Sequence, residues 1–110
     1  MDLPVKLEIP DERFPPEVEA SAYFVIAEAL TNVMKHSGAT SAMVAVSVVA
    51  GSLYLEVEDN GTGGADPSGP GLVGINDRVT ALGGRLEVGR PGGGGTLLSA
   101  TLPLPAVVRR

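Results

Sequence analysis

Asp59 is the residue whose type and position most directly suggest chemistry. In the run from Leu53 to Asp59, apolar and polar residues alternate, and Asp59 falls in phase with the apolar ones. Such alternation predicts a strand with one face toward the core, so this carboxylate is expected to point to the core side. The glycines that follow, in Asn60-Gly61-Thr62-Gly63-Gly64, let backbone approach a ligand. The segment therefore predicts a ligand pocket, although a strand followed by Asn-Gly is also typical of a tight turn that the Asp simply caps.

A second group of polar side chains lies on one stripe of a predicted helix. At about 100° per residue, Glu28, Asn32 and Lys35 border the apolar sector, and His36 lies at its edge. A carboxylate and an amide oxygen one turn apart could hold a hard cation such as Mg²⁺, and Lys35 could meet phosphate. The stripe could equally be a solvated face, and His36 could do no more than interact with the end of the helix.

Composition limits the classes of protein that this chain can represent. Its 110 residues, 44% of them hydrophobic, fit one domain with one core. No apolar run approaches the ~20 residues of a membrane span, so we expect no membrane contact by this domain. The absence of cysteine excludes a disulfide framework and a thiolate metal site. A net charge of -5 disfavours nucleic acid, and an anionic ligand would need backbone N–H groups, a helix N-terminus or a metal ion.

Helical and alternating patterns follow one another along the chain. One helix is expected after Pro15-Pro16, ending near Ser37-Gly38, and a second from Leu72 to Leu82, ended by Gly83-Gly84. The expected strands are Val5 to Ile9, Val44 to Val48, Leu53 to Asp59, Arg85 to Gly89 and Thr96 to Leu102. Helices and antiparallel hairpins in one chain predict an α+β two-layer sandwich, without an internal repeat or a second domain.

Four motifs, in this order, resemble the ATP-binding domain shared by gyrase, the heat-shock chaperones, sensor histidine kinases and mismatch-repair ATPases. The helical stripe Glu28-x-x-x-Asn32-x-x-Lys35-His36 is similar to that family's asparagine box. The three segments similar to its glycine boxes are Asp59-x-Gly61-x-Gly63, Gly69-x-Gly71-Leu72 and Gly93-x-Gly95-Thr96. The resemblance covers nearly the whole chain. It implies the Bergerat fold, a mixed, mostly antiparallel sheet with three helices. The third helix would lie at Pro10 to Phe14 or in the ATP lid, at about Gly64 to Pro70.

The resemblance also implies roles for the motif residues. Asp59 would accept a hydrogen bond from the exocyclic amine of adenine, and Thr96 would support Asp59 or reach adenine through water. Asn32 and Glu28 would serve the Mg²⁺ ion, Glu28 by orienting a metal-bound water or acting as a base, while Lys35 and His36 would offset phosphate charge. Backbone close to the nucleotide would come from the remaining motif residues, which are Gly61, Gly63, Gly69, Gly71, Leu72, Gly74 and Gly95.

The segment from Gly71 to Gly84 resembles bacterial sensor kinases with a short ATP lid, which here would span about Gly64 to Pro70. Ile75-Asn76-Asp77 departs from the Met-Arg-Glu usual in that subclass. The departure puts a basic role at position 76 in doubt and leaves Arg78 as the nearby cation.

The resemblance implies a protein-histidine kinase domain of two-component signal transduction. It would pass the γ-phosphate of ATP to a histidine on a separate dimerisation and phosphoacceptor domain, which then serves a response regulator. We expect residues 1–110 to be one monomeric, cytoplasmic domain of a longer kinase, and both a soluble and a membrane-anchored parent stay open. The domain is expected to be unable to label itself, because its single histidine belongs to the asparagine box. The alternatives are an anti-sigma-factor-type serine kinase and a non-catalytic, ATP-dependent interaction module.

Overall fold

The computed structural model describes residues 5–34, 38–61, 70–89 and 95–105 of the chain. Within these residues, five strands and two helices follow one another in the order expected from the sequence. They are β1 (Val5–Glu8), α1 (Pro16–Asn32), β2 (Ala42–Val49), β3 (Ser52–Asp59), α2 (Pro70–Ala81), β4 (Arg85–Gly89) and β5 (Thr96–Pro103). Neither helix of this part of the chain is long and apolar enough to cross a bilayer.

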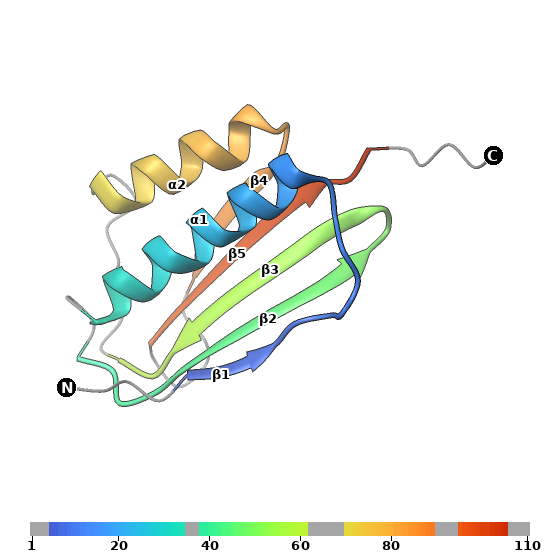
Figure 1. Cartoon of the computed structure of the whole chain (residues 1–110). Helices are drawn as coiled ribbons and strands as arrows, with labels where there is room; N and C mark the ends of the chain where they lie inside the picture. Colours follow the sequence, from blue (N-terminus) through green and yellow to red (C-terminus); the bar gives the residue numbers. More distant parts are fainter. Residues whose placement is uncertain (1–4, 35–37, 62–69, 90–94, 106–110) are drawn as a thin grey trace.

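The strands form one mixed sheet in the order β1-β2-β3-β5-β4. β1 pairs with β2 in parallel, and every other neighbouring pair is antiparallel. Both helices lie on the same face of this sheet (Figure 1). The predicted two-layer α+β sandwich with a mostly antiparallel mixed sheet is therefore confirmed.

The third helix that the resemblance implies is not formed at residues 10–14. That segment, bounded by Pro10 and Pro15, is an irregular connection, because proline lacks the N–H that a helix needs and restricts the residue before it. The other expected place for this helix, the lid, lies outside the described residues except for Pro70, which begins α2.

The core lies between the helices and the helix-facing side of β3. Leu53, Leu55 and Val57 alternate along this strand, and each is at most 2% exposed. They pack in one cluster with apolar residues of α1 and α2, including Val25 and Ile75. Full burial of each large aliphatic side chain contributes about 1.5–3 kcal/mol, so this alternation holds both helices on one face of the sheet.

A charged pair fixes the start of α1. The helix has Pro16 in its first turn and no side-chain cap, but the Glu19 carboxylate accepts hydrogen bonds from Nε and Nη2 of Arg13, each at 2.8 Å. Glu19 Oε2 also accepts from the backbone N–H of Phe14 at 3.0 Å. The Arg13 hydrogen bonds, followed by the Phe14 N–H, lower the pKa of Glu19 to about 2. The chain is thereby turned into the helix with Phe14 against the core.

Gly83 and Gly84 end α2 and turn the chain into β4. Gly83 has a φ of +77°, its N–H donates to Thr80 O, and the N–H of Gly84 donates to Val79 O, both at 2.9 Å. This is the Schellman arrangement, which uses carbonyls that the helix itself leaves unpaired. A Cβ on Gly84 would overlap the carbonyl oxygen of Thr101 on β5. Only glycine lets α2 end this close to the sheet.

We predict that Gly84→Ala lowers the free energy of unfolding by about 1–3 kcal/mol, because its Cβ must displace the β5 backbone. Gly89→Ala is the matched control, since nothing lies within 4 Å of a Cβ at that position. It should change the free energy of unfolding by no more than about 0.5 kcal/mol. Urea denaturation of both variants measures the difference, and equal stability of the two would contradict the packing described for Gly84.

Candidate functional site

The predicted functional segments meet at one end of the sandwich. In Figure 1, α1 ends, α2 begins, β3 ends and β5 begins at this same end of the molecule. The helices are packed along each other, with the Arg78 guanidinium of α2 4.6 Å from the centre of the Phe24 ring of α1. This cation–π contact joins the two helices that border the site. Segments separated by most of the chain are thus brought to one place by the fold.

Asp59 is the last residue of β3 and is only 5% exposed. It is paired in register with Ala42 on one side and with Thr96 on the other. Its carboxylate is therefore on the core side, as the alternation predicts. Oδ1 accepts a hydrogen bond from the backbone N–H of Gly61 at 2.8 Å, so Asp59 also caps the turn that follows the strand. The pocket and turn interpretations of this segment are compatible, because the carboxylate has a second oxygen.

Gly95 brings the backbone before β5 against Asp59. Its φ is +83°, and a Cβ at this position would overlap the carbonyl oxygen of Asp59. Both the conformation and the close approach require glycine. Thr96, the next residue, begins β5 and is half-buried beside Asp59. The motif at Gly95-Thr96 thus holds the end of β3 in position through backbone packing.

Glu28 and Asn32 lie in the last two turns of α1 and are both half-buried. They follow Phe24 at intervals of four residues, so they share the side of α1 that faces α2. In the described part of the chain, no three acidic or histidine side chains gather into a metal cluster. An amide and one carboxylate still suit Mg²⁺, which keeps several waters and is usually held by one or two protein oxygens together with phosphates.

Of the remaining described glycine-box residues, one follows β3 and the others lie within α2. Gly61 is half-buried just after β3, and Leu72 is buried near the start of α2. Gly71 is in the first turn of α2, and Gly74 lies one turn later, where an added Cβ would only touch Phe24 at 3.9 Å. Gly74 is thus part of the helix and not of a lid.

Several predicted site residues lie outside the described part of the chain. They are Lys35, His36, Gly63, Gly69 and Gly93, together with the predicted lid from Gly64 up to the residue before Pro70.

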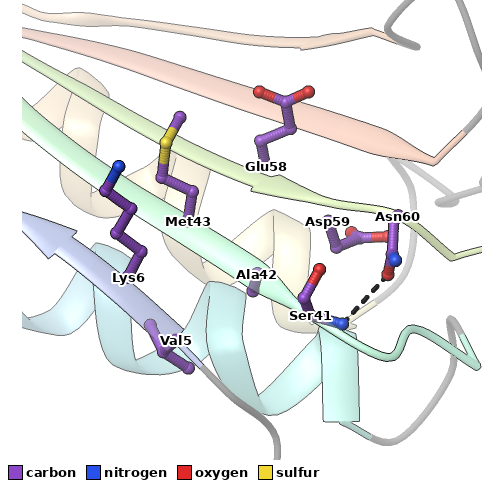
Figure 2. A pocket seen from close by; sticks show the side chains of 8 residues that line it. All are labelled: Val5, Lys6, Ser41, Ala42, Met43, Glu58, Asp59 and Asn60. Carbon is purple, nitrogen blue, oxygen red and sulfur yellow. Dashed lines mark hydrogen bonds between the residues drawn. The ribbon is translucent and has the colours of Figure 1, made fainter.

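An open hollow of about 510 Å³ is lined by the adjoining ends of β1, β2 and β3. Lys6, Met43 and Glu58 are register neighbours on the sheet face away from the helices, and the hollow continues round the strand ends to Asp59 and Asn60 (Figure 2). The hollow therefore borders the end of β3.

Sequence reasoning missed Asn60, whose side chain bonds to the residues that lead into β2. Figure 2 shows one of these bonds, from the backbone N–H of Ser41 to Asn60 Oδ1 at 3.0 Å. Phe24 was also missed as the partner of Arg78. The polar pair Thr40-Ser41 before a strand and the amide directly after its partner strand are the signals that could have suggested the Asn60 contact.

Comparison with known proteins agrees with this arrangement. Residues 17–106 match the family model described as histidine kinase-, DNA gyrase B-, and HSP90-like ATPase. The sensor histidine kinase YxjM of Bacillus subtilis is 33% identical over 95 residues, which cover 86% of this chain and 23% of that protein. The nitrate/nitrite sensor protein NarQ of Escherichia coli is 42% identical over 82 residues, covering 68% of this chain and 14% of that protein.

Among solved structures, the histidine kinase domain of a blue-light activated histidine kinase from Erythrobacter litoralis is similar to this fold. The TM-score is 0.79 at 26% identity, and the match covers 93% of this chain and 52% of that one. The chain thus spans less than a quarter of the length of the two sensor proteins and about half of the solved kinase domain. With motifs, fold and family model in agreement, the chain belongs to the histidine kinase-, DNA gyrase B- and HSP90-like ATPases, as an ATP-binding domain of the kind found in sensor histidine kinases.

Proposed function

We propose that this domain binds Mg-ATP and donates the γ-phosphate to a histidine on a separate dimerisation and phosphoacceptor domain of the same kinase. The observation that carries the proposal is the buried Asp59 carboxylate at the end of β3, in a chain that belongs to a family of ATPases. A response regulator would receive the phosphate next. Because ATP is the substrate, the domain would act in the cytoplasm.

Adenine recognition follows from the orientation of Asp59. With Oδ1 engaged by the Gly61 N–H, Oδ2 is the oxygen that would accept a hydrogen bond from the exocyclic amine of adenine. Guanine has a carbonyl oxygen at the corresponding position and cannot donate there. The neighbouring backbone is held close, since a Cβ at Gly95 would overlap the Asp59 carbonyl oxygen.

The phosphates would lie between the ends of α1 and α2. Asn32 would hold Mg²⁺, Glu28 would orient one of its waters, and Lys35 with His36 would offset phosphate charge. The backbone N–H groups at the start of α2 favour an anion, and the first turn contains no acidic residue that would repel it. Bound Mg²⁺ supplies charge neutralisation of the phosphates. In the transfer, a nitrogen–phosphorus bond forms on the acceptor histidine as the bond from the γ-phosphorus to the bridging oxygen breaks, leaving ADP.

The assignment of Asp59 predicts adenine selectivity. GTP should bind more weakly than ATP by about 1–3 kcal/mol, the cost of leaving a buried polar group unmet. Asp59→Asn should lose much of the ATP affinity and most of this preference. Asp11→Asn, which removes the same charge at an exposed position before α1, should leave both unchanged. Isothermal titration calorimetry measures these affinities, and equal binding of ATP and GTP by the unaltered domain would refute the assignment.

The assignment of Asn32 predicts a change in metal dependence. Asn32→Asp should alter the Mg²⁺ requirement of ATP binding and abolish phosphotransfer while the circular dichroism spectrum stays the same. Ala20→Asp adds the same charge at an exposed position of the same helix and should change neither property. Unchanged phosphotransfer by a folded Asn32→Asp protein would return Glu28, Asn32 and Lys35 to the role of a solvated face.

The separate acceptor predicts that this chain alone binds Mg-ATP without labelling itself. Adding the histidine-bearing segment of the parent kinase should produce acid-labile phosphohistidine on that segment. Transfer should be slow, because losing the covalent link lowers the effective concentration of the acceptor. Radiolabelled ATP measures both results. Stable label on the isolated domain would contradict the proposal, and acid-stable phosphoserine on an added antagonist protein would indicate the anti-sigma-factor type of kinase.

A further inference from the structure

Asn60 makes a set of hydrogen bonds that reaches far along the sequence. Its Oδ1 accepts from the backbone N–H groups of Thr40 at 2.9 Å and Ser41 at 3.0 Å. Its Nδ2 donates to Thr40 Oγ1 at 2.8 Å, and its backbone N–H donates to Ser41 O at 3.4 Å. One exposed side chain thus holds the segment that enters β2, about twenty residues earlier in the chain.

These bonds are not those of an ordinary turn. Asn in a turn usually bonds to backbone two residues further on, but the corresponding role here is taken by Asp59 through the N–H of Gly61. The β2–β3 ladder ends with the pair Ala42 and Asp59. The Asn60 side chain therefore extends the connection between the strands past their last register pair.

The consequence is that the backbone around Asp59 is held from several directions. Ala42 and Thr96 flank it in the sheet, and Gly95 packs against its carbonyl oxygen. The side-chain bonds of Asn60 hold the residue directly after Asp59. Without this last anchor, the backbone after β3 could turn about Asp59, and the Gly61 N–H that orients the carboxylate would move with it. The local geometry of a buried carboxylate decides which oxygen meets a ligand.

We propose that Asn60 is a positioning residue for base recognition, which acts by anchoring the turn that orients the Asp59 carboxylate. The inference rests on the proposed role of Asp59 as the acceptor for adenine. Asn60 itself need not touch the nucleotide. Its contribution is to keep Oδ2 of Asp59 aimed at the base while Oδ1 stays bonded to Gly61.

Three variants separate this role from a general effect on the fold. Asn60→Ala removes all the side-chain bonds. Asn60→Asp keeps two acceptor contacts to the Thr40 and Ser41 N–H groups and loses only the donor to Thr40 Oγ1. Thr40→Val is the matched control, because it removes only that same side-chain bond and keeps the shape and both backbone N–H contacts.

Asn60→Ala should raise the dissociation constant for ATP about tenfold, the effect of losing one buried hydrogen bond to the base. GTP never makes that bond, so its affinity should stay the same and the ATP-to-GTP preference should fall by about the same factor. Asn60→Asp and Thr40→Val should keep the preference within about threefold of the unaltered domain. Calorimetry with both nucleotides measures these ratios.

A measurement without nucleotide tests the anchor itself. The Gly61 amide hydrogen should exchange faster in Asn60→Ala than in the unaltered domain, while amides in the centre of β3 should exchange as before. An Asn60→Ala protein that is merely less stable, with an unchanged nucleotide preference and unchanged relative exchange at Gly61, would overturn the inference. If the unaltered domain prefers ATP and this variant keeps that preference, the inference alone fails. Equal binding of both nucleotides by the unaltered domain would instead refute the proposed function.

Discussion

The burial of one carboxylate, that of Asp59, is the constraint on which the site depends. An acid in phase with the core residues of a central strand is unfavourable unless it is hydrogen-bonded or meets a ligand. Within the described residues, the Gly61 N–H donates to this carboxylate, and Gly95 packs against the Asp59 carbonyl oxygen. This combination requires a strand on each side, a close-packed Gly95 and a turn of fixed geometry directly after β3. The glycine at position 95 follows from that requirement.

The hydrophobic core provides the rigidity that the site needs. Leu53, Leu55 and Val57 on β3 bind α1 and α2 to the same face of the sheet, so the last turns of α1 and the first turn of α2 come to the end of β3. Binding groups held at the ends of such elements are placed by the packing of the core behind them. The Arg78–Phe24 contact and the Schellman end of α2 set the relation of the helices to each other and to the sheet. Asp59, which could serve the base, and Glu28 and Asn32, which could serve the metal ion, therefore belong to one packed scaffold.

Local periodicity and the positions of proline and glycine explain how much of this arrangement could be predicted from the sequence. Strict alternation from Leu53 to Asp59 shows which face each residue occupies, and it placed Asp59 on the core side correctly. Prolines before α1 and glycines after α2 marked helix ends to within a few residues. Of the two places expected for a third helix, residues 10–14 form none, because the flanking prolines make that segment unsuited to a helix, and the lid lies outside the described residues.

The sequence by itself determined the elements, the side of each strand that faces the core, and the motifs that lie on them. Beyond the predicted hairpins, only the tertiary structure decided which strands are neighbours, with β1 parallel to β2 and β5 inserted between β3 and β4. It also revealed that the Asn60 side chain bonds to Thr40 and Ser41 and that Phe24 contacts Arg78. The physical reason is the range of the interactions. Side-chain periodicity is a property of adjacent residues, whereas strand pairing and hydrogen bonds between residues about twenty apart depend on how the whole chain is packed.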